Sequence, residues 1–572
     1  MPTANLINLF DRTISYGTLT IENGCIDRIE HLGPERPGEP YILPGFVDAH
    51  VHVESSLLTP PQFARLAVVH GTVATVSDPH EIGNVLGVAG VDYMIQEGKR
   101  VPFKFMFGAP SCVPATTFET AGATIDMTGV RDLLARPDVG YLAEMMNYPG
   151  VLNHDPDLMA KIDLAKAAGK PVDGHAPGLT GSDARHYIDA GISTDHECFT
   201  YEEGFDKARC GMNILIREGS AARNFDALIP LLADFPDQVM FCSDDKHPDT
   251  LVQSHINQLV VRALTAGHSL WNVLRAACLN PVLHYNMPVG LLREGDPADY
   301  IVIDDLTNFR VQQTVIDGQT VAENGTSLIS DLRSEHVNQF NCSVKEVGEF
   351  GVTAGPGRSG DPVGLIRVIE ALDGQLITNE LHLEPRLENG QITADPDRDI
   401  LKLVVVNRYH DAPPAVAFIK NFGLKHGAIA SSVGHDSHNI TAVGCDDESI
   451  CRAINLVIEA RGGLSAVAGT APHQHDAEVM SRREFLHITT TPETQLLPLP
   501  VAGLMTDADG YDVAAQYILL DEFAKRELGS TLSAPFMTLS FMALLVIPSL
   551  KLSNMGLFDG KVFDFTSLRI MS

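Results

Sequence analysis

The sequence lacks several features that mark whole classes of protein. No basic segment followed by an apolar run occurs near the N-terminus, so a secretory signal is not expected. The longest apolar stretch, residues 539–550, is too short to cross a bilayer. The nine cysteines are scattered without a single CxxC pair, which is typical of free thiols in a reducing compartment. These absences predict a cytoplasmic protein with no membrane partner.

Basic runs and three common catalytic signatures are also missing. The net charge is -32, and an acidic surface repels phosphate backbones, so no nucleic-acid partner is expected. The chain has neither a Gly-x-Ser-x-Gly elbow nor a Gly-x-x-x-x-Gly-Lys-Ser/Thr loop, which argues against serine nucleophiles and phosphate loops. His52-Val53-Glu54 matches the His-x-Glu of zinc nucleobase deaminases, but no Pro-Cys-x-x-Cys follows it. That deaminase design is therefore excluded.

What is present is a repeated strand-then-helix pattern. The chain has 572 residues, more than one ordinary core holds, so several domains are expected. Eight short apolar runs, each followed by an alanine- or leucine-rich helical stretch, predict a (β/α)8 barrel of the TIM type. The expected strands are 42–51, 71–76, 103–107, 140–145, 171–173, 192–195, 212–216 and 239–242.

Both flanks of the barrel have the texture of β-hairpins. The turns Glu22-Asn23-Gly24 and Asp317-Gly318 each lie between short β-rich runs. Neither flank is large enough to fold alone, so we expect them to pair into one small β-sandwich. Strand 401–406 and helices 448–460 and 512–528 indicate a further α+β domain. The predicted α/β architecture comprises 1–40 and 286–345 (sandwich), 41–285 (barrel) and 346–572 (C-terminal domain).

A His-x-His pair ends the first expected barrel strand. Side chains alternate along a strand, so His50 and His52 point the same way, at the end where barrel enzymes build their sites. Two such imidazoles can hold Zn, Mn or Fe. A single histidine at a strand end is usually structural, but ligand-type side chains recur after strands five, six and eight. These are His175, His196 and Asp244, and together they predict a metal site at the barrel mouth.

This set resembles the metal ligands of the amidohydrolase superfamily, and residues 295–302 resemble the segment that re-enters its small β-sandwich. Longer motifs are similar to the bacterial adenine deaminase family, and the resemblance runs through nearly the whole chain, including the C-terminal domain. These motifs are Val47 to Ser56, Ser77-Asp78-Pro79-His80-Glu81, Ala143-Glu144-Met145-Met146-Asn147-Tyr148-Pro149-Gly150, Arg217-Glu218-Gly219-Ser220 and His435-Asp436-Ser437-His438-Asn439.

The resemblance also implies a metal count. Many binuclear relatives carry a carboxylated lysine on strand four, and this chain has Glu144 there, as the adenine deaminase family does. A carboxylate can bridge two cations, so two metal ions per chain are expected. The implied metal is manganese, with iron or zinc as alternatives. The implied ligands are His50, His52 and Asp244 on one metal, His175 and His196 on the other, and Glu144 between them.

The implied reaction is the hydrolytic deamination of adenine to hypoxanthine and ammonia, a step of purine salvage. Metals would lower the pKa of a bound water, and Asp244 would carry its proton to the leaving amine. Glu81, on the loop after strand two, is the candidate for protonating N1 of the ring. Asp245 could accept from a purine N–H. Further candidates for orienting substrate or ligands, or for the floor of the purine pocket, are His80, Asp78, Arg217, Glu218 and Ser220.

Other interpretations stay open at this point. Glu81 and Asp245 could cap helices, Glu144 could form an ion pair, and the motif 435–439 could be either a lid or a structural hydrogen-bond cluster. The ligand set alone also fits an amidohydrolase acting on another cyclic amide or amino-heterocycle. A catalytically silent metal-binding scaffold is the alternative from a different class. A homo-oligomer is expected, with the C-terminal domain as its natural contact.

Overall fold

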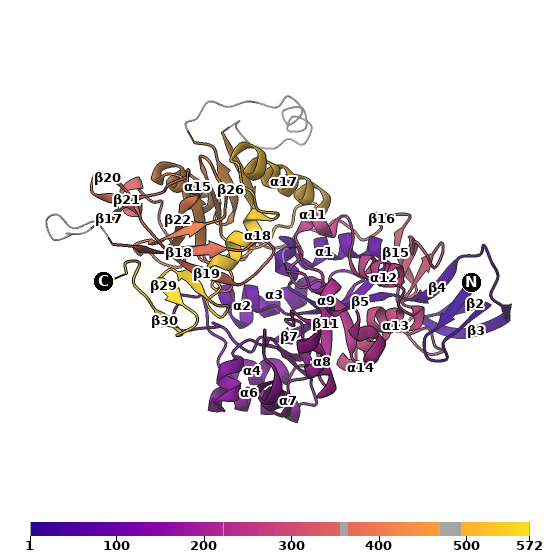
Figure 1. The fold of residues 1–572 in the computed structure, drawn as a ribbon. Coiled ribbons are helices and arrows are strands. Elements are labelled where there is room, and N and C mark those ends of the chain that lie inside the picture. The colour runs from indigo at the N-terminus through magenta and orange to yellow at the C-terminus, as the bar shows by residue number, and fades with distance from the viewer. Residues whose placement is uncertain (1, 221, 355–363, 470–492, 571–572) are drawn as a thin grey trace.

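The computed structural model describes residues 2–220, 222–354, 364–469 and 493–570 (Figure 1). The N-terminal strands and the C-terminal domain lie at opposite ends of the molecule, with the barrel between them. Within these ranges, no helix combines the length and the apolar character needed to span a bilayer. The cysteines are all free thiols, as the absence of paired spacing predicted.

Eight parallel strands form the predicted barrel. They lie in two hydrogen-bonded ladders, β5-β6-β7-β8-β9 and β10-β11-β12. The ladders are joined where Ser193 N–H donates to Val172 O (2.8 Å) and where Asp244 N–H donates to His50 O (2.9 Å). The strands are β5 (Phe46–Val51), β6 (Thr72–Ser77), β7 (Lys104–Ala109), β8 (Val139–Met145), β9 (Val172–Gly174), β10 (Thr194–Asp195), β11 (Asn213–Arg217) and β12 (Val239–Cys242).

Helices follow the barrel strands and bury apolar faces against them. In α4, for example, Val130, Leu133 and Leu134 are buried, at the spacing that places them on one helix face. The main helices are α1 (Pro60–Ala67), α2 (His80–Leu86), α3 (Val88–Gly98), α4 (Met127–Leu134), α6 (Pro156–Ala167), α7 (Gly181–Asp189), α8 (Tyr201–Arg209), α12 (Ile256–Thr265), α13 (Leu270–Leu274) and α14 (Asn280–Tyr285).

One expected strand is in fact two. The run 42–51, predicted as a single barrel strand, divides at Gly45 into β4 (Tyr41–Pro44) and β5, and β4 belongs to a different sheet. Gly45 packs against β6 so closely that an added Cβ would lie 2.3 Å from Val73 Cγ1. The apolar character of the run is continuous because both strands are buried. The Pro44-Gly45 dipeptide is the local sign of this break, because both residues interrupt regular structure.

The two flanks pair with each other, as predicted, and their strands form one continuous eight-stranded sheet. Its order is β16-β15-β14-β13-β4-β1-β2-β3, and the antiparallel pairing of β13 with β4 joins the flanks. Asn23 and Gly24 (φ 50° and 81°) form the tight two-residue turn between β2 and β3. The strands are β1 (Thr3–Asn8), β2 (Thr13–Glu22), β3 (Cys25–Pro34), β13 (Tyr300–Ile303), β14 (Val311–Ile316), β15 (Gln319–Glu323) and β16 (Thr326–Ser327).

The C-terminal domain has its own eight-stranded sheet, in the order β19-β18-β23-β22-β25-β24-β26-β27, with α15 (Asp447–Glu459) packed on its central strands. Backbone bonds from Thr506 N–H to Leu57 O (2.8 Å) and from Thr59 N–H to Thr506 O (3.1 Å) fasten it to the barrel. Its other elements are β18 (Ile366–Ala371), β19 (Thr378–Leu383), β22 (Ile400–Val406), β23 (Ala415–Lys420), β24 (Ala428–Ser431), β25 (Ile440–Gly444), β26 (Gly463–Val467), β27 (Thr494–Pro498), α17 (Gly510–Glu522), α18 (Pro535–Ser540), β28 (Leu550–Ser553), β29 (Gly556–Asp559) and β30 (Asp564–Phe565).

Candidate active site

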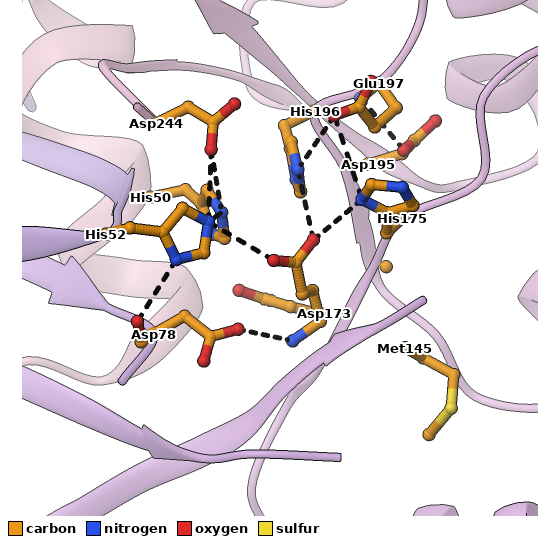
Figure 2. Close-up of polar contacts among 12 residues, drawn as sticks. His50, His52, Asp78, Met145, Asp173, His175, Asp195, His196, Glu197 and Asp244 are labelled. Carbon is orange, nitrogen blue, oxygen red and sulfur yellow. Dashed lines mark hydrogen bonds and ion pairs between the residues drawn. The ribbon is translucent and has the colours of Figure 1, made fainter. Parts of the chain in front are cut away.

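Histidines and carboxylates from the carboxyl ends of several barrel strands meet in one buried place (Figure 2). The parallel strands of a closed barrel all end at the same rim, so residues far apart in the sequence are brought together there. The residues are His50 in β5, His52 just after it, Glu144 in β8, His175 after β9, His196 after β10 and Asp244 after β12.

His50, His52 and Asp244 form the first group. The Nε2 atoms of His50 and His52 lie 3.2 Å apart, and Asp244 Oδ1 is 3.6 Å from the first and 3.2 Å from the second. All three side chains are buried. The two ring nitrogens therefore converge on the same carboxylate oxygen from the strand that closes the barrel.

His175 and His196 form the second group, and Glu144 stands between the groups. Glu144 Oε2 is 2.9 Å from His175 Nδ1 and 3.3 Å from His196 Nε2. Its other oxygen, Oε1, is 3.3 Å from His52 Nε2 in the first group. Burial favours a protonated Glu144, but the surrounding histidines outweigh it and hold the pKa of this carboxyl well below its usual range. Each carboxylate oxygen thus faces one group.

This arrangement fits the binding of divalent cations. Buried imidazole nitrogens that face each other at 3.2 Å cannot both donate a hydrogen bond along the line between them. Most of the distances between a histidine nitrogen and a carboxylate oxygen in this cluster are 3.2 to 3.6 Å. These distances are longer than those of ordinary charge-assisted hydrogen bonds. Nitrogen and carboxylate donors around shared points are the ligands that Zn, Mn and Fe prefer.

Arg217 lies next to the first group and pairs with two carboxylates of the site. Its guanidinium Nη1 is 2.7 Å from Asp244 Oδ2, and it also pairs with both oxygens of Glu197. Arg217 is completely enclosed, so its charge is available only to these two carboxylates. Burial raises the pKa of Asp244, but Arg217 and His52 outweigh it and keep the pKa well below its usual range.

Glu81 lies in the first turn of α2, where the sequence allowed either a catalytic or a capping role. Its carboxylate makes no cap to that helix. Instead Oε1 accepts a hydrogen bond from His435 Nδ1, and Oε2 contacts His438 Nε2. His80 Nε2 lies 3.4 Å from Oε1. The helix N-terminus is served by Glu54, whose Oε1 accepts from Ile82 N–H at 3.2 Å.

Asp78 and Asp245 each accept hydrogen bonds from groups of the site. Asp78 accepts hydrogen bonds from the backbone N–H of Glu144 (3.2 Å) and of His80 (3.0 Å), which fixes the course of two strand ends. Asp245 accepts from Ser55 Oγ at 2.5 Å and faces the same cavity as Asp244. Both aspartates are buried and placed to orient other groups.

Two predicted substrate residues are not brought to the cavity. Glu218 is buried away from this cavity and pairs with Arg262 Nη1 at 2.8 Å. The hydroxyl of Ser220 lies 2.7 Å from Thr250 Oγ1 and accepts from His247 N–H at 2.8 Å. Of this motif, Arg217 contacts a metal-type ligand, Asp244. The pocket floor predicted from Arg217, Glu218 and Ser220 stays a prediction, and none of the three lines this cavity.

Sequence reasoning also missed several residues that the structure places at the site. Glu197 approaches His196 Nε2 at 3.5 Å and was recognisable only as the neighbour of a predicted ligand. Asp436 lies 3.7 Å from His80 Nε2, within the motif whose role was left open. Apolar side chains close the cavity on the C-terminal side, and no local signal marked them; they are Leu376, Phe541 and Leu544.

Comparison with known proteins agrees with this geometry. Residues 41–321 match the Amidohydrolase family, and residues 375–476 and 487–564 match the Adenine deaminase C-terminal domain. The chain is 53% identical to an adenine deaminase of Salinibacter ruber over 562 residues, covering 98% of this chain and 97% of that protein. An adenine deaminase of a Sulfurovum species is 52% identical over 562 residues, with 98% of each chain covered.

The chain belongs to the adenine deaminase family. The Amidohydrolase family is metal-dependent, and this chain has a buried histidine–carboxylate cluster whose side chains could hold a metal ion. Among solved structures, an N-acetyl-D-glucosamine-6-phosphate deacetylase from Mycobacterium smegmatis aligns with a TM-score of 0.43 at 16% identity, covering 56% of this chain and 99% of that one.

Proposed function

We propose that this protein hydrolyses adenine to hypoxanthine and ammonia. Family membership over nearly the full chain supports the reaction and the substrate. Within the site, the observation that carries the proposal is Glu144, which has one oxygen toward each of two histidine groups. A bridging carboxylate in a buried, water-poor place suits a hydrolase that must generate its nucleophile at neutral pH.

Two manganese ions per chain are the proposed cofactor, with iron or zinc able to replace them. The first would be held by His50, His52 and Asp244, and the second by His175 and His196, with Glu144 shared. When bound, such ions lower the pKa of a water toward neutrality, so that it can attack the ring carbon that carries the amine. The remaining chemistry belongs to side chains of the protein.

Asp244 is the proposed base. The Arg217 guanidinium holds the pKa of this carboxyl well below its usual range despite burial, so Asp244 is ionised at neutral pH and can accept a proton. The same carboxyl can then release that proton to the departing amine. Because Arg217 fixes Oδ2, proton transfer uses the opposite oxygen, Oδ1, on the histidine side.

Glu81 is the proposed partner that protonates N1 of the purine. Burial opposes ionisation, but His435, His438 and His80 outweigh it and hold the pKa of Glu81 well below its usual range. Glu81 is therefore a carboxylate in the resting protein and must first collect a proton before donating it. Asp245, which lines the same cavity, would accept from a purine N–H.

Adenine turnover followed by ultraviolet absorbance tests the proposal, with protein loaded with manganese and a chelated sample beside it. We expect conversion to hypoxanthine that is lost on chelation and restored by manganese. Metal-loaded protein that leaves adenine untouched would refute the substrate, and a panel of cyclic amides and amino-heterocycles would then be assayed. Light scattering on the same samples tests the proposed homo-oligomer, and fractionation of the source cells tests the proposed cytoplasmic location.

A further inference from the structure

A loop of the C-terminal domain enters the barrel mouth. Residues 434–439 connect β24 and β25 of the C-terminal sheet, yet His435 and Asp436 line the same cavity as the barrel ligands. His435, Asp436 and His438 are all buried. This loop, which we call the 434–439 loop, thus belongs to the C-terminal sheet and also lines the cavity of the barrel.

The loop is held in one conformation by its own domain. His435 N–H donates to Ser540 O (3.0 Å), and the His435 ring stacks on Phe541 with centroids 4.9 Å apart and an interplanar angle of 21°. His438 N–H donates to Gly434 O at 2.7 Å. Tyr409 OH donates to the carbonyl of Ser437 at 2.6 Å. The two histidines are therefore presented on a fixed frame.

The hydrogen bonds of His438 also define its tautomer. Gly434 N–H donates to His438 Nδ1 at 3.3 Å, so Nδ1 acts as an acceptor and carries no proton. The proton of the neutral ring is then on Nε2, which faces Glu81 Oε2. His435 Nδ1 faces the other oxygen, Oε1. Both oxygens of one buried carboxylate are occupied by imidazoles from a different domain.

We propose that His435 and His438 are positioning residues that aim the Glu81 carboxyl for proton transfer to the substrate. This inference rests on the proposed function, which gives Glu81 its acid–base role. The C-terminal domain would then complete the proton-transfer machinery of the barrel. A carboxyl group must be correctly oriented to relay a proton, and two fixed imidazoles, one at each oxygen, set that orientation.

Three other charged residues, which the test leaves unaltered, also face Glu81. His80 Nε2 lies 3.4 Å from Glu81 on the barrel side, and the carboxyls of Glu54 and Asp245 oppose its negative charge. These three residues lie outside the 434–439 loop and are not altered in variants of its histidines. A change in the behaviour of Glu81 would then come from His435 and His438.

The test compares alanine with isosteric amides. His435→Ala and His438→Ala remove the contacts, while His435→Asn and His438→Gln place an amide near Nδ1 and Nε2 respectively. His382→Ala, at a half-exposed histidine on the edge of the same domain, is the matched control. Each variant is loaded with manganese and assayed for metal content, kcat, KM and the pH dependence of kcat.

We expect kcat of each alanine variant to fall about 10- to 100-fold, with KM changed less than about threefold and metal content unchanged. The acidic limb of the pH profile should move to higher pH, because Glu81 loses a group that favours its ionised form. The Asn and Gln variants should recover most of kcat, but their limb should stay displaced because an amide carries no charge.

Several results would contradict the inference, and each can be recognised separately. Alanine variants that match His382→Ala in kcat and in the position of the limb would overturn the inference, and so would a loss of kcat that only follows loss of metal. If an alanine variant is insoluble, the Asn and Gln variants decide, since an undisplaced limb in them overturns it. A metal-loaded wild-type protein inactive on adenine would overturn the proposed function and this inference with it.

Discussion

Arg217 offers a sharp test of how the site is held together. Its side chain is 1% exposed, and among the residues that the structure describes it is the one that pairs with both Asp244 and Glu197. Arg217→Met keeps the length of the side chain and removes the charge. Two buried carboxylates would then lose their cation, and the cost is that of leaving charge unpaired in a low-dielectric interior.

The expected loss is about 3–5 kcal/mol in the free energy of unfolding, the range for breaking a buried ion pair. The two pairs share one guanidinium, so their contributions are not additive. Arg209→Met is the matched control, because Arg209 is 66% exposed and pairs with Asp206 at 2.6 Å on the surface. An exposed pair contributes only about 0.2–1 kcal/mol.

Trp271 makes the assay simple, since it is the only tryptophan and lies in α13 of the barrel. Its fluorescence during urea unfolding reports on the barrel rather than on the C-terminal domain. We expect the midpoint of Arg217→Met to fall by about 1 M or more relative to wild type. Equal midpoints for Arg217→Met and Arg209→Met would refute the view that Arg217 balances buried charge.

Three further predictions follow from single contacts. Glu144→Gln should lose its metal, and its kcat should fall at least about 100-fold, whereas the control Glu218→Gln should keep both metal and activity. Elemental analysis and turnover assays measure the two effects, and full metal content in Glu144→Gln would contradict a bridging role. Burial lowers the pKa of His247 to about 3, below its unfolded value, so stability is lost as pH falls below about 6.5. At pH 5.5 the lost free energy of unfolding is about 1.4 kcal/mol. His247→Asn should abolish this loss, as urea titrations of both proteins at pH 7 and pH 5.5 would show, and a pH dependence equal to that of wild type would contradict the prediction. Gly45→Ala should cost about 1–3 kcal/mol by overpacking Val73, measured by Trp271 fluorescence, and a change below about 0.5 kcal/mol would contradict the close approach.

Barrel and ligand positions were predictable because they depend on local patterns. Each barrel strand is an apolar run that ends in a polar residue, and the barrel places every such end at one rim. His50 and His52 could therefore be assigned to the same face, and His175, His196 and Asp244 to the same mouth. The turns at Asn23-Gly24 and Asp317-Gly318 were likewise visible, because few residues adopt that backbone conformation.

Contacts between domains were not predictable in the same way. Nothing in the local sequence of His435 or Leu376 indicates that either lies over a barrel cavity, because that depends on how two domains dock. The same limit applies to Arg217: its position at a strand end was clear, but its direction was not. The side chains of Glu218 and Ser220 contact Arg262 and Thr250 and do not line this cavity, and nothing in the local sequence indicates those contacts.

The balance of charge at the site leads to a last prediction, on metal removal. Six carboxyl groups line the cavity: Glu81, Glu144, Glu197, Asp244, Asp245 and Asp436. Among the described residues, Arg217 is the one arginine or lysine that pairs with any of them. Divalent cations would neutralise much of this buried charge.

Ligand binding to the folded state alone stabilises it by RT ln(1 + [L]/Kd), about 4 kcal/mol at a free metal concentration of 1,000 Kd. Chelation should therefore lower the midpoint of barrel unfolding, seen through Trp271, and manganese should restore it in a concentration-dependent way. The C-terminal domain has its own core, so the effect should be smaller there, as hydrogen exchange in β22 and β25 would show. A barrel midpoint that chelation leaves unchanged would mean that the carboxylates are balanced by protons on the surrounding histidines rather than by metal.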